Sequence, residues 1–391
     1  VKYEFALIIT PVKEVDTKSH FSNRYFHATS PTPEVIANGG NVMNVHHANK
    51  YNPYINYPFI AQKEMRELVD EWHKKGWKVK IYYTVRELSN YLTEIWALRS
   101  LGFEILADGN GGGDRWLQEH LVNNYTPQWY AYLGNGTSDE AILNSGESRW
   151  YNYYVEGLAW LLKNMDIDGL YLDDVSYDRR ILKRMRKVME AIKPDSCMID
   201  LHSNTSFSIG PVNQYLEFYP YIDRTWYGEG FSYDIHPADF WLVETSGIPF
   251  GVMNDILLQV GINRHRGMLY GMTVRGQNDW NLWKLWDDFS IANSKMNGYW
   301  EKNPVVTTDH KNVYATTYIK DGSVLVALAS WIKEPVKVKM NIDWKRLGLN
   351  PSEVNIIAPE IYNYQKEKKF KVDELIPIDA LSDCLIIISK K

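Results

Sequence analysis

The chain has 391 residues, a net charge of −5 at pH 7 and 45% hydrophobic residues. This length exceeds one ordinary core of roughly 100–200 residues and fits a barrel of about 250–300 residues with a small second domain. Lysine and arginine are scattered without a basic block, which excludes a nucleic-acid-binding footprint. The sequence contains no run of about 18 apolar residues, the length that a membrane-spanning helix needs. The two cysteines lie far apart in the sequence, so we expect neither a disulfide framework nor a zinc knuckle.

Short apolar runs alternate with segments of helical periodicity along the first 300 or so residues. This alternation is typical of βα units and a parallel sheet. Eight strands can be placed, which predicts an α/β protein built on a (β/α)8 TIM barrel. The predicted strands are residues 5–9, 41–45, 79–83, 169–174, 198–200, 224–227, 249–253 and 267–274.

The predicted helices between these strands cover residues 60–75, 93–100, 147–165, 180–192 and 280–296. The first of them should end at Gly76, because glycine readily takes the left-handed conformation that closes a helix. Between residues 103 and 146 the alternation gives way to glycine, asparagine, aspartate and aromatic residues. A loop of this length inside a compact domain is usually functional or contains small added elements.

Beyond residue 302 the pattern changes to short strands separated by turns. The strand-like segments are residues 312–317, 323–330, 336–340, 354–357 and 384–389. Regular alternation with little helix predicts a small antiparallel β-sandwich. We therefore expect a barrel domain over residues 1–302 and a β-sandwich domain over residues 303–391.

Polar residues follow nearly every predicted barrel strand. The active site of a TIM barrel lies at the carboxyl ends of its strands, so these residues are candidates by position. The candidates for substrate binding are His46, His47, Arg86, Glu87, Trp129, His202, Trp226, Tyr227, Asp255, Arg275 and Asn278.

Aromatic residues make up 14% of the chain, and most of them will fill the core. Some stand in polar, glycine-rich surroundings, where a flat aromatic face suits the C–H face of a sugar ring. We expect at least one of Trp129, Tyr132, Trp226 and Tyr227 to line the substrate pocket. The expected ligand is a carbohydrate.

Two adjacent carboxylates, Asp173 and Asp174, end the apolar segment that precedes them. Like charges at this distance raise the pKa of one group, so that one carboxyl keeps its proton near neutral pH. A glycosidic oxygen needs such a proton donor. The competing interpretation is a helix N-cap, or a rim ion pair with Arg179 or Arg180.

His46 and His47 raise the question of a metal site. Adjacent residues on a strand point to opposite faces, so both histidines could not easily bind one ion. Hydrogen bonding of one of them to a sugar hydroxyl is the better interpretation. We expect neither a metal nor a cofactor.

The stretch from Asp168 to Arg179, DGLYLDDVSYDR, resembles the fourth-strand motif of barrels related to glycoside hydrolase family 123. The layout of barrel followed by small β-domain is also similar. The resemblance implies an exo-acting β-N-acetylhexosaminidase, in which the substrate's own 2-acetamido oxygen is the nucleophile. It would make Asp173 the residue that orients and polarises the acetamido group, and Asp174 the general acid/base. The family motif has Asp followed by Glu, whereas two adjacent Asp, as here, serve the O-GlcNAcase-type hydrolases.

Two alternatives remain open. In barrels similar to α-galactosidases a strand-four aspartate is the nucleophile, and Glu229 (or Asp223) would be the acid/base here. A carbohydrate-binding barrel without catalysis would keep the aromatic residues and dispense with the paired acids. The enzyme class as a whole leads us to expect a periplasmic or secreted protein.

Overall fold

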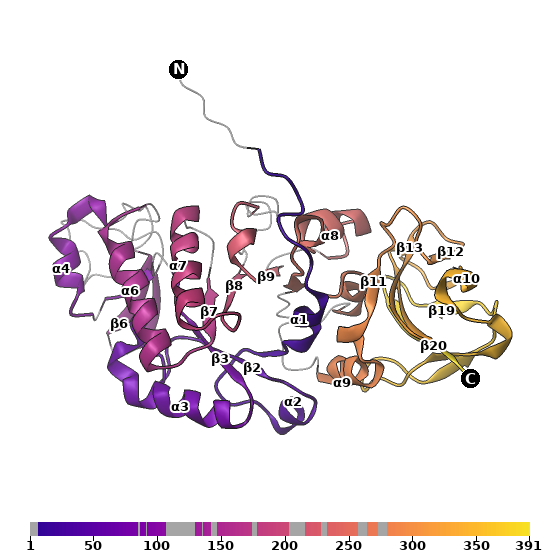
Figure 1. Ribbon diagram of the computed structural model, residues 1–391, viewed down its shortest axis with the longest axis horizontal. Coiled ribbons are helices and arrows are strands. Elements are labelled where there is room, and N and C mark those ends of the chain that lie inside the picture. The colour runs from indigo at the N-terminus through magenta and orange to yellow at the C-terminus, as the bar shows by residue number, and fades with distance from the viewer. Residues whose placement is uncertain are drawn as a thin grey trace, which may run out of the picture.

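The computed structural model describes residues 7–84, 87–90, 92–106, 130–134, 136–141, 147–173, 178–202, 216–227, 233–256, 264–272 and 280–391. These residues form a barrel domain and a C-terminal β-domain, which lie at opposite ends of the long axis of the molecule (Figure 1). None of the described helices is both long and apolar enough to cross a bilayer.

The barrel sheet has seven parallel strands in its described part, ordered along the sheet as they are along the chain. This is the arrangement of a TIM barrel, and the predicted fold class is confirmed. The strands are β1 (Tyr25–Phe26), β2 (Val42–Val45), β3 (Lys78–Tyr82), β7 (Gly169–Leu172), β8 (Met198–His202), β9 (Arg224–Tyr227) and β10 (Asp255–Ile256).

Helices cover the outer face of this sheet (Figure 1). In α3 (Gln62–Lys74) the buried residues Met65, Leu68, Val69 and Trp72 recur every three to four positions and form one apolar stripe. The helix is followed by Gly76 with φ +78°, as the sequence predicted. The other helices are α1 (Thr17–Ser22), α2 (Pro33–Ala37), α4 (Ile95–Arg99), α6 (Arg149–Asn164), α7 (Arg179–Ile192), α8 (Ala238–Glu244) and α9 (Trp280–Phe289).

Side chains of each strand alternate between two environments. The outward residues, such as Leu170 and Leu201, join the core beneath the helices. The inward residues fill the barrel and form a cluster of their own: Tyr25, Val42, Tyr82, Tyr171, Met198 and Trp226. The rings of Tyr25 on β1 and Trp226 on β9 lie 5.0 Å apart, so the sheet curves until distant strands meet across its interior.

The chain between β3 and α6 contains a small antiparallel sheet. Its strands are β4 (Glu87–Ser89), β5 (Tyr130–Gly134) and β6 (Thr137–Ala141), with β6 in the middle. Added elements were expected in this long segment. The side chains of Glu87, Ser89 and Asp139 are buried although the sheet is an insertion.

The C-terminal domain is an antiparallel β-structure, as predicted. Its main sheet consists of β11 (Lys295–Asn297), β13 (Val313–Lys320), β14 (Ser323–Ser330), β20 (Asp383–Lys390), β17 (Val354–Ala358) and β18 (Lys368–Phe370). Two pairs accompany it: β12 (Val306–Thr308) with β16 (Met340–Ile342), and β15 (Val336–Val338) with β19 (Ile376–Ile378). The boundary at residue 302 stays a prediction.

Three predicted barrel strands are wrong in their described residues. Leu7 and Ile9 are 87% and 80% exposed and belong to no strand, and the first strand is β1 instead. Residues Ile248–Phe250 and Arg264–Tyr270 form 3-10 helices where the seventh and eighth strands were expected, and β10 follows the first of these helices. Because β1 and β10 have only two residues each, they offer too little periodicity to be distinguished from loops in the sequence.

Candidate active site

Asp173 directly follows β7 at the carboxyl end of the barrel, where TIM-barrel enzymes place their catalytic groups. Two neighbouring strands contribute the side chains that hold it. Tyr82 at the end of β3 donates a hydrogen bond from Oη to Asp173 Oδ2 over 2.7 Å. The Nδ1 atom of His202, at the end of β8, hydrogen-bonds Oδ1. Thr84 donates to the Asp173 carbonyl over 2.8 Å. The backbone carbonyl and both carboxylate oxygens of Asp173 are therefore each held by a hydrogen bond.

The Asp173 side chain is still 32% exposed, so part of it remains accessible to solvent. Burial by itself would raise the pKa of this carboxyl. The hydrogen bond and charge of His202, the hydrogen bond from Tyr82 and the charge of His46 outweigh burial and hold the pKa well below its usual range. Asp173 is therefore an ionised carboxylate that a ligand can reach.

A wall of aromatic rings stands beside this carboxylate. The Tyr82 ring lies 4.5 Å from His46, 4.7 Å from His47 and 6.0 Å from Tyr171, measured between ring centroids. His46 and His47 lie side by side at 4.5 Å rather than on opposite faces. That expectation is wrong because β2 ends at Val45, so both histidines belong to the loop, where strand alternation does not apply.

The inserted sheet supports this wall from outside the barrel. His47 Nε2 lies 2.9 Å from Asp139 Oδ2 on β6, and the Asp139 side chain has no exposed surface. Ser89 on β4 donates to the other Asp139 oxygen. Glu87, at the start of β4, brings Oε2 to 3.4 Å from Tyr82 Oη. The inserted sheet therefore contributes directly to the arrangement around Asp173.

Deeper in the barrel, charged residues form buried ion pairs with one another. Lys80 on β3 pairs with Asp200 on β8, and neither side chain has any exposed surface. Arg224 on β9 pairs with Asp255 on β10. Trp226 donates from Nε1 to Asp200 Oδ2 over 3.3 Å. These contacts fill the barrel interior below Asp173.

The structure brings five of the predicted site residues together: Asp173, His46, His47, Glu87 and His202. Trp226 and Asp255 lie in the buried interior, with 2% and 0% of their surface exposed. Of Tyr227 the structure describes the backbone. The remaining predicted residues lie outside the described ranges: Arg86, Trp129, Asp174, Glu229, Arg275 and Asn278.

Two alternatives from the sequence can be assessed here. The N-cap of α7 is Asp178, which accepts from the Arg180 amide over 2.7 Å, so Asp173 does not serve as that cap. Asp223 precedes β9 and pairs with Arg186 over 2.6 Å at the amino ends of the strands. It therefore lies at the end of the barrel away from Asp173 and cannot be the acid/base.

Sequence reasoning missed Tyr82, Thr84 and Asp139. The first two end the third predicted strand, so the positional argument that selected its acidic and basic residues could have included them. Asp139 lies in the inserted segment, and no pattern in the sequence links it to His47.

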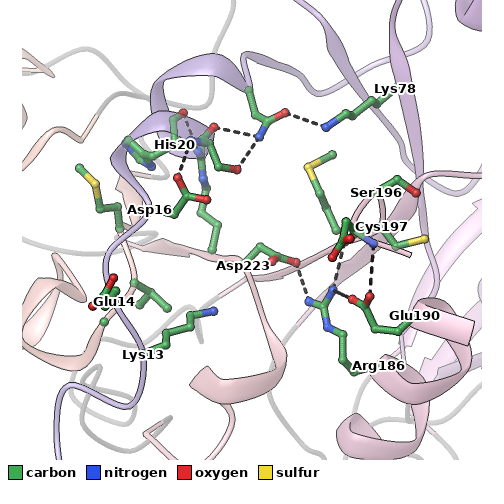
Figure 2. A pocket seen from close by; sticks show the side chains of 18 of the residues that line it. Lys13, Glu14, Asp16, His20, Lys78, Arg186, Glu190, Ser196, Cys197 and Asp223 are labelled. Atoms are coloured by element: carbon green, nitrogen blue, oxygen red, sulfur yellow. Dashed lines mark hydrogen bonds and ion pairs between the residues drawn. The ribbon is translucent and has the colours of Figure 1, made fainter. Parts of the chain in front are cut away.

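A cavity of about 500 Å³ opens where strands β1, β3, β8 and β9 begin. Figure 2 shows the side chains that line it, with Lys13, Asp16, Arg186 and Asp223 among them. Within it, Arg186 pairs with Asp223 and Glu190. Among the described residues, no group of three or more His, Cys, Asp or Glu could hold a metal ion.

Comparison with solved structures identifies similar architectures. A noncanonic maltogenic α-amylase from Thermotoga neapolitana has a TM-score of 0.59 and 10% sequence identity, over 95% of this chain and 99% of that one. An α-amylase from Geobacillus thermoleovorans, complexed with acarbose, has a TM-score of 0.58 and 11% identity, over 97% of this chain and 100% of that one. At such identities the likeness shows the fold alone. A search of curated proteins found no match.

Family models match almost the whole length of the sequence. Residues 16–277 match the TIM-barrel domain of glycoside hydrolase 123, and residues 278–389 match its C-terminal domain. The two models meet near the start of α9, before the main sheet of the β-domain begins at β11. The chain belongs to glycoside hydrolase family 123 and is a glycoside hydrolase with a TIM-barrel domain.

Proposed function

We propose that this glycoside hydrolase is a β-N-acetylhexosaminidase that uses the 2-acetamido group of its substrate as the nucleophile. The observation that carries the proposal is the state of Asp173: ionised, held on both oxygens by Tyr82 and His202, and still partly exposed. An oxazolinium ion formed by acetamido attack carries positive charge, and a fixed carboxylate stabilises it. Asp173 accepts the acetamido N–H in this proposal and orients its oxygen toward the anomeric carbon.

Asp174 is the proton donor in this proposal. Its neighbour Asp173 is held as an anion, and a like charge next in the chain raises the pKa of a carboxyl. A carboxyl that keeps its proton can protonate the leaving glycosidic oxygen and later deprotonate water. In this proposal Asp173 stabilises the positive charge and Asp174 transfers the proton.

The rival mechanism makes Asp173 a covalent nucleophile and Glu229 the acid/base. An ionised, partly exposed carboxylate suits that role too, so the choice of substrate must discriminate between the two mechanisms. Aryl glycosides with and without a 2-acetamido group, matched in their leaving group, provide the test. We expect turnover of the 2-acetamido compounds and little or none of the plain hexosides. The opposite preference would rule out substrate assistance.

The leaving group separates the acid from the stabilising residue. Asp174→Asn should lower kcat by about 10²–10⁴ for leaving groups of high pKa and by much less for acidic phenols, which need little protonation. Measuring kcat/KM across a series of aryl 2-acetamido glycosides gives the slope. If Glu229→Gln carries this dependence instead, and azide rescues Asp173→Ala, the covalent mechanism is correct.

A further inference from the structure

We infer that Tyr82 is a positioning residue of the hydrolysis: its hydroxyl fixes the Asp173 carboxylate in the orientation in which it meets the reacting part of the substrate. The inference rests on the proposed function only for the identity of that reacting part, the acetamido group. It concerns a buried residue that contacts Asp173.

The first support is the geometry of the hydrogen bond. Tyr82 Oη lies 2.7 Å from Asp173 Oδ2, a normal distance for O–H donation to a carboxylate, and 1% of Tyr82 is exposed. His202 occupies the other oxygen of the same carboxylate. Two donors from different strands stop the carboxylate from rotating about its terminal torsion, which is otherwise soft.

The second support is that the Tyr82 proton has a preferred acceptor. Glu87 Oε2 stands 3.4 Å from the hydroxyl, against 2.7 Å for Asp173. Burial, together with the charges of Glu87 and Asp173, raises the pKa of Tyr82 well above its ordinary value. The hydroxyl thus stays protonated, and its proton is directed at Asp173.

The third support is that the phenol ring is closely packed. His46 and His47 pack against it at 4.5 Å and 4.7 Å, and the contact of His47 with Asp139 ties it to the inserted sheet. The position of the hydroxyl is therefore set by β3, by the loop after β2 and by β6 together. A group held in this way can impose its geometry on Asp173.

Tyr82→Phe tests the inference, because it removes one oxygen atom and keeps the ring packing. Tyr83→Phe is the matched control: the next residue along the chain, it points outward and donates to the Tyr154 carbonyl over 3.0 Å. We expect Tyr82→Phe to lower kcat by about 10- to 100-fold with KM changed by less than about threefold, the worth of a hydrogen bond to a charged group. Tyr83→Phe should leave kcat and KM near wild type.

A second readout separates positioning from a general loss of structure. A thiazoline analogue of the oxazolinium intermediate should bind Tyr82→Phe more weakly by the same factor as kcat/KM falls, whereas the product sugar should bind both proteins alike. The loss of kcat should not depend on the leaving group, since Asp173 is not the proton donor. Thermal unfolding of both variants verifies that they are folded.

Three results would overturn the inference: equal kinetics for the two variants, a loss confined to KM, or a loss that grows with leaving-group pKa. Failure of the proposed function would look different. The wild type would then hydrolyse plain hexosides. Tyr82→Phe would still lower kcat for them with KM unchanged, because the hydrogen bond that orients Asp173 does not depend on which substrate group the carboxylate contacts.

Discussion

Asp173 and Asp200 come from neighbouring strands and face the same barrel interior, yet their surroundings are opposite. Asp200 has no exposed surface and contacts the ammonium of Lys80 and the indole of Trp226. Asp173 keeps 32% of its side chain exposed, and the hydrogen bonds that hold its carboxylate come from a phenol and an imidazole. The charge of Asp200 is balanced by an ammonium with no exposed surface, whereas Asp173 is held by donors from two strands and stays partly exposed, so that its carboxylate can act on a ligand. The aspartate in the lower, buried layer of the barrel thus serves stability, and the aspartate in the upper layer serves the chemistry.

Of the two aspartates compared, Asp173 should give the larger loss of activity when its charge is removed. Asp173→Asn keeps the shape of the side chain and loses its negative charge. We expect kcat for a 2-acetamido aryl glycoside to fall by about 10²–10³, the usual loss when a preorganised stabilising group is removed. The loss should be similar for all leaving groups. Steady-state kinetics measure it, and a variant with near wild-type kcat would show that the open carboxylate has no part in the reaction.

The buried carboxylate should respond in the opposite way. Asp200→Asn leaves the Lys80 ammonium without its counterion inside the barrel, which should cost about 3–5 kcal/mol in the free energy of unfolding. The molecules that remain folded should keep most of their kcat. Urea denaturation combined with active-site titration separates the two quantities.

The double variant Lys80→Met with Asp200→Leu is the control for that interpretation. It removes both charges and substitutes apolar side chains of similar volume, so its unfolding free energy should lie within about 2 kcal/mol of wild type. If the double variant is as unstable as Asp200→Asn, the ion pair contributes more to the unfolding free energy than the mutual neutralisation of two buried charges. The contrast between the two layers would then need revision.

A smaller effect concerns pH and His20, a buried residue of α1 beside the lower layer. Burial and the charge of Arg224 lower the pKa of His20 to about 4, against the opposing influence of Asp255 and of the Gly271 carbonyl. Between pH 6.5 and pH 4 the unfolded chain therefore binds a proton that the folded one does not, and stability falls as pH falls through this window. From pH 7 to pH 5 this amounts to about 2 kcal/mol.

His20→Gln should remove this part of the pH dependence, because glutamine can still donate to the Gly271 carbonyl but does not titrate. Urea denaturation at pH 7, 6 and 5 gives the unfolding free energy of both proteins. Their curves should lie close together at pH 7 and separate toward pH 5, where the wild type loses stability that the variant keeps. Parallel curves would show that His20 gains its proton as readily in the folded protein as in the unfolded one.

The sequence predicted the β-domain better than the edges of the barrel. The segment 323–330 coincides with β14, an eight-residue strand whose side chains are nearly all buried and mostly apolar. In contrast, β1 and β10 were missed, and an exposed apolar segment at residues 7–9 was taken for a strand. A long strand can be recognised in the sequence from its own run of apolar residues. A two-residue strand forms only because neighbouring strands offer backbone hydrogen bonds.

By itself the sequence determined the class of fold, the order of its main elements and the position of Asp173 after a buried strand, because apolar periodicity and chain order are local properties. Only the tertiary structure decided which aspartate is neutralised and which stays reachable. Lys80 and Asp200 are 120 residues apart in the chain, and Tyr82 and Asp173 are 91 apart. Barrel curvature brings each pair together, and contacts across a barrel depend on the register of strands that no short stretch of sequence encodes.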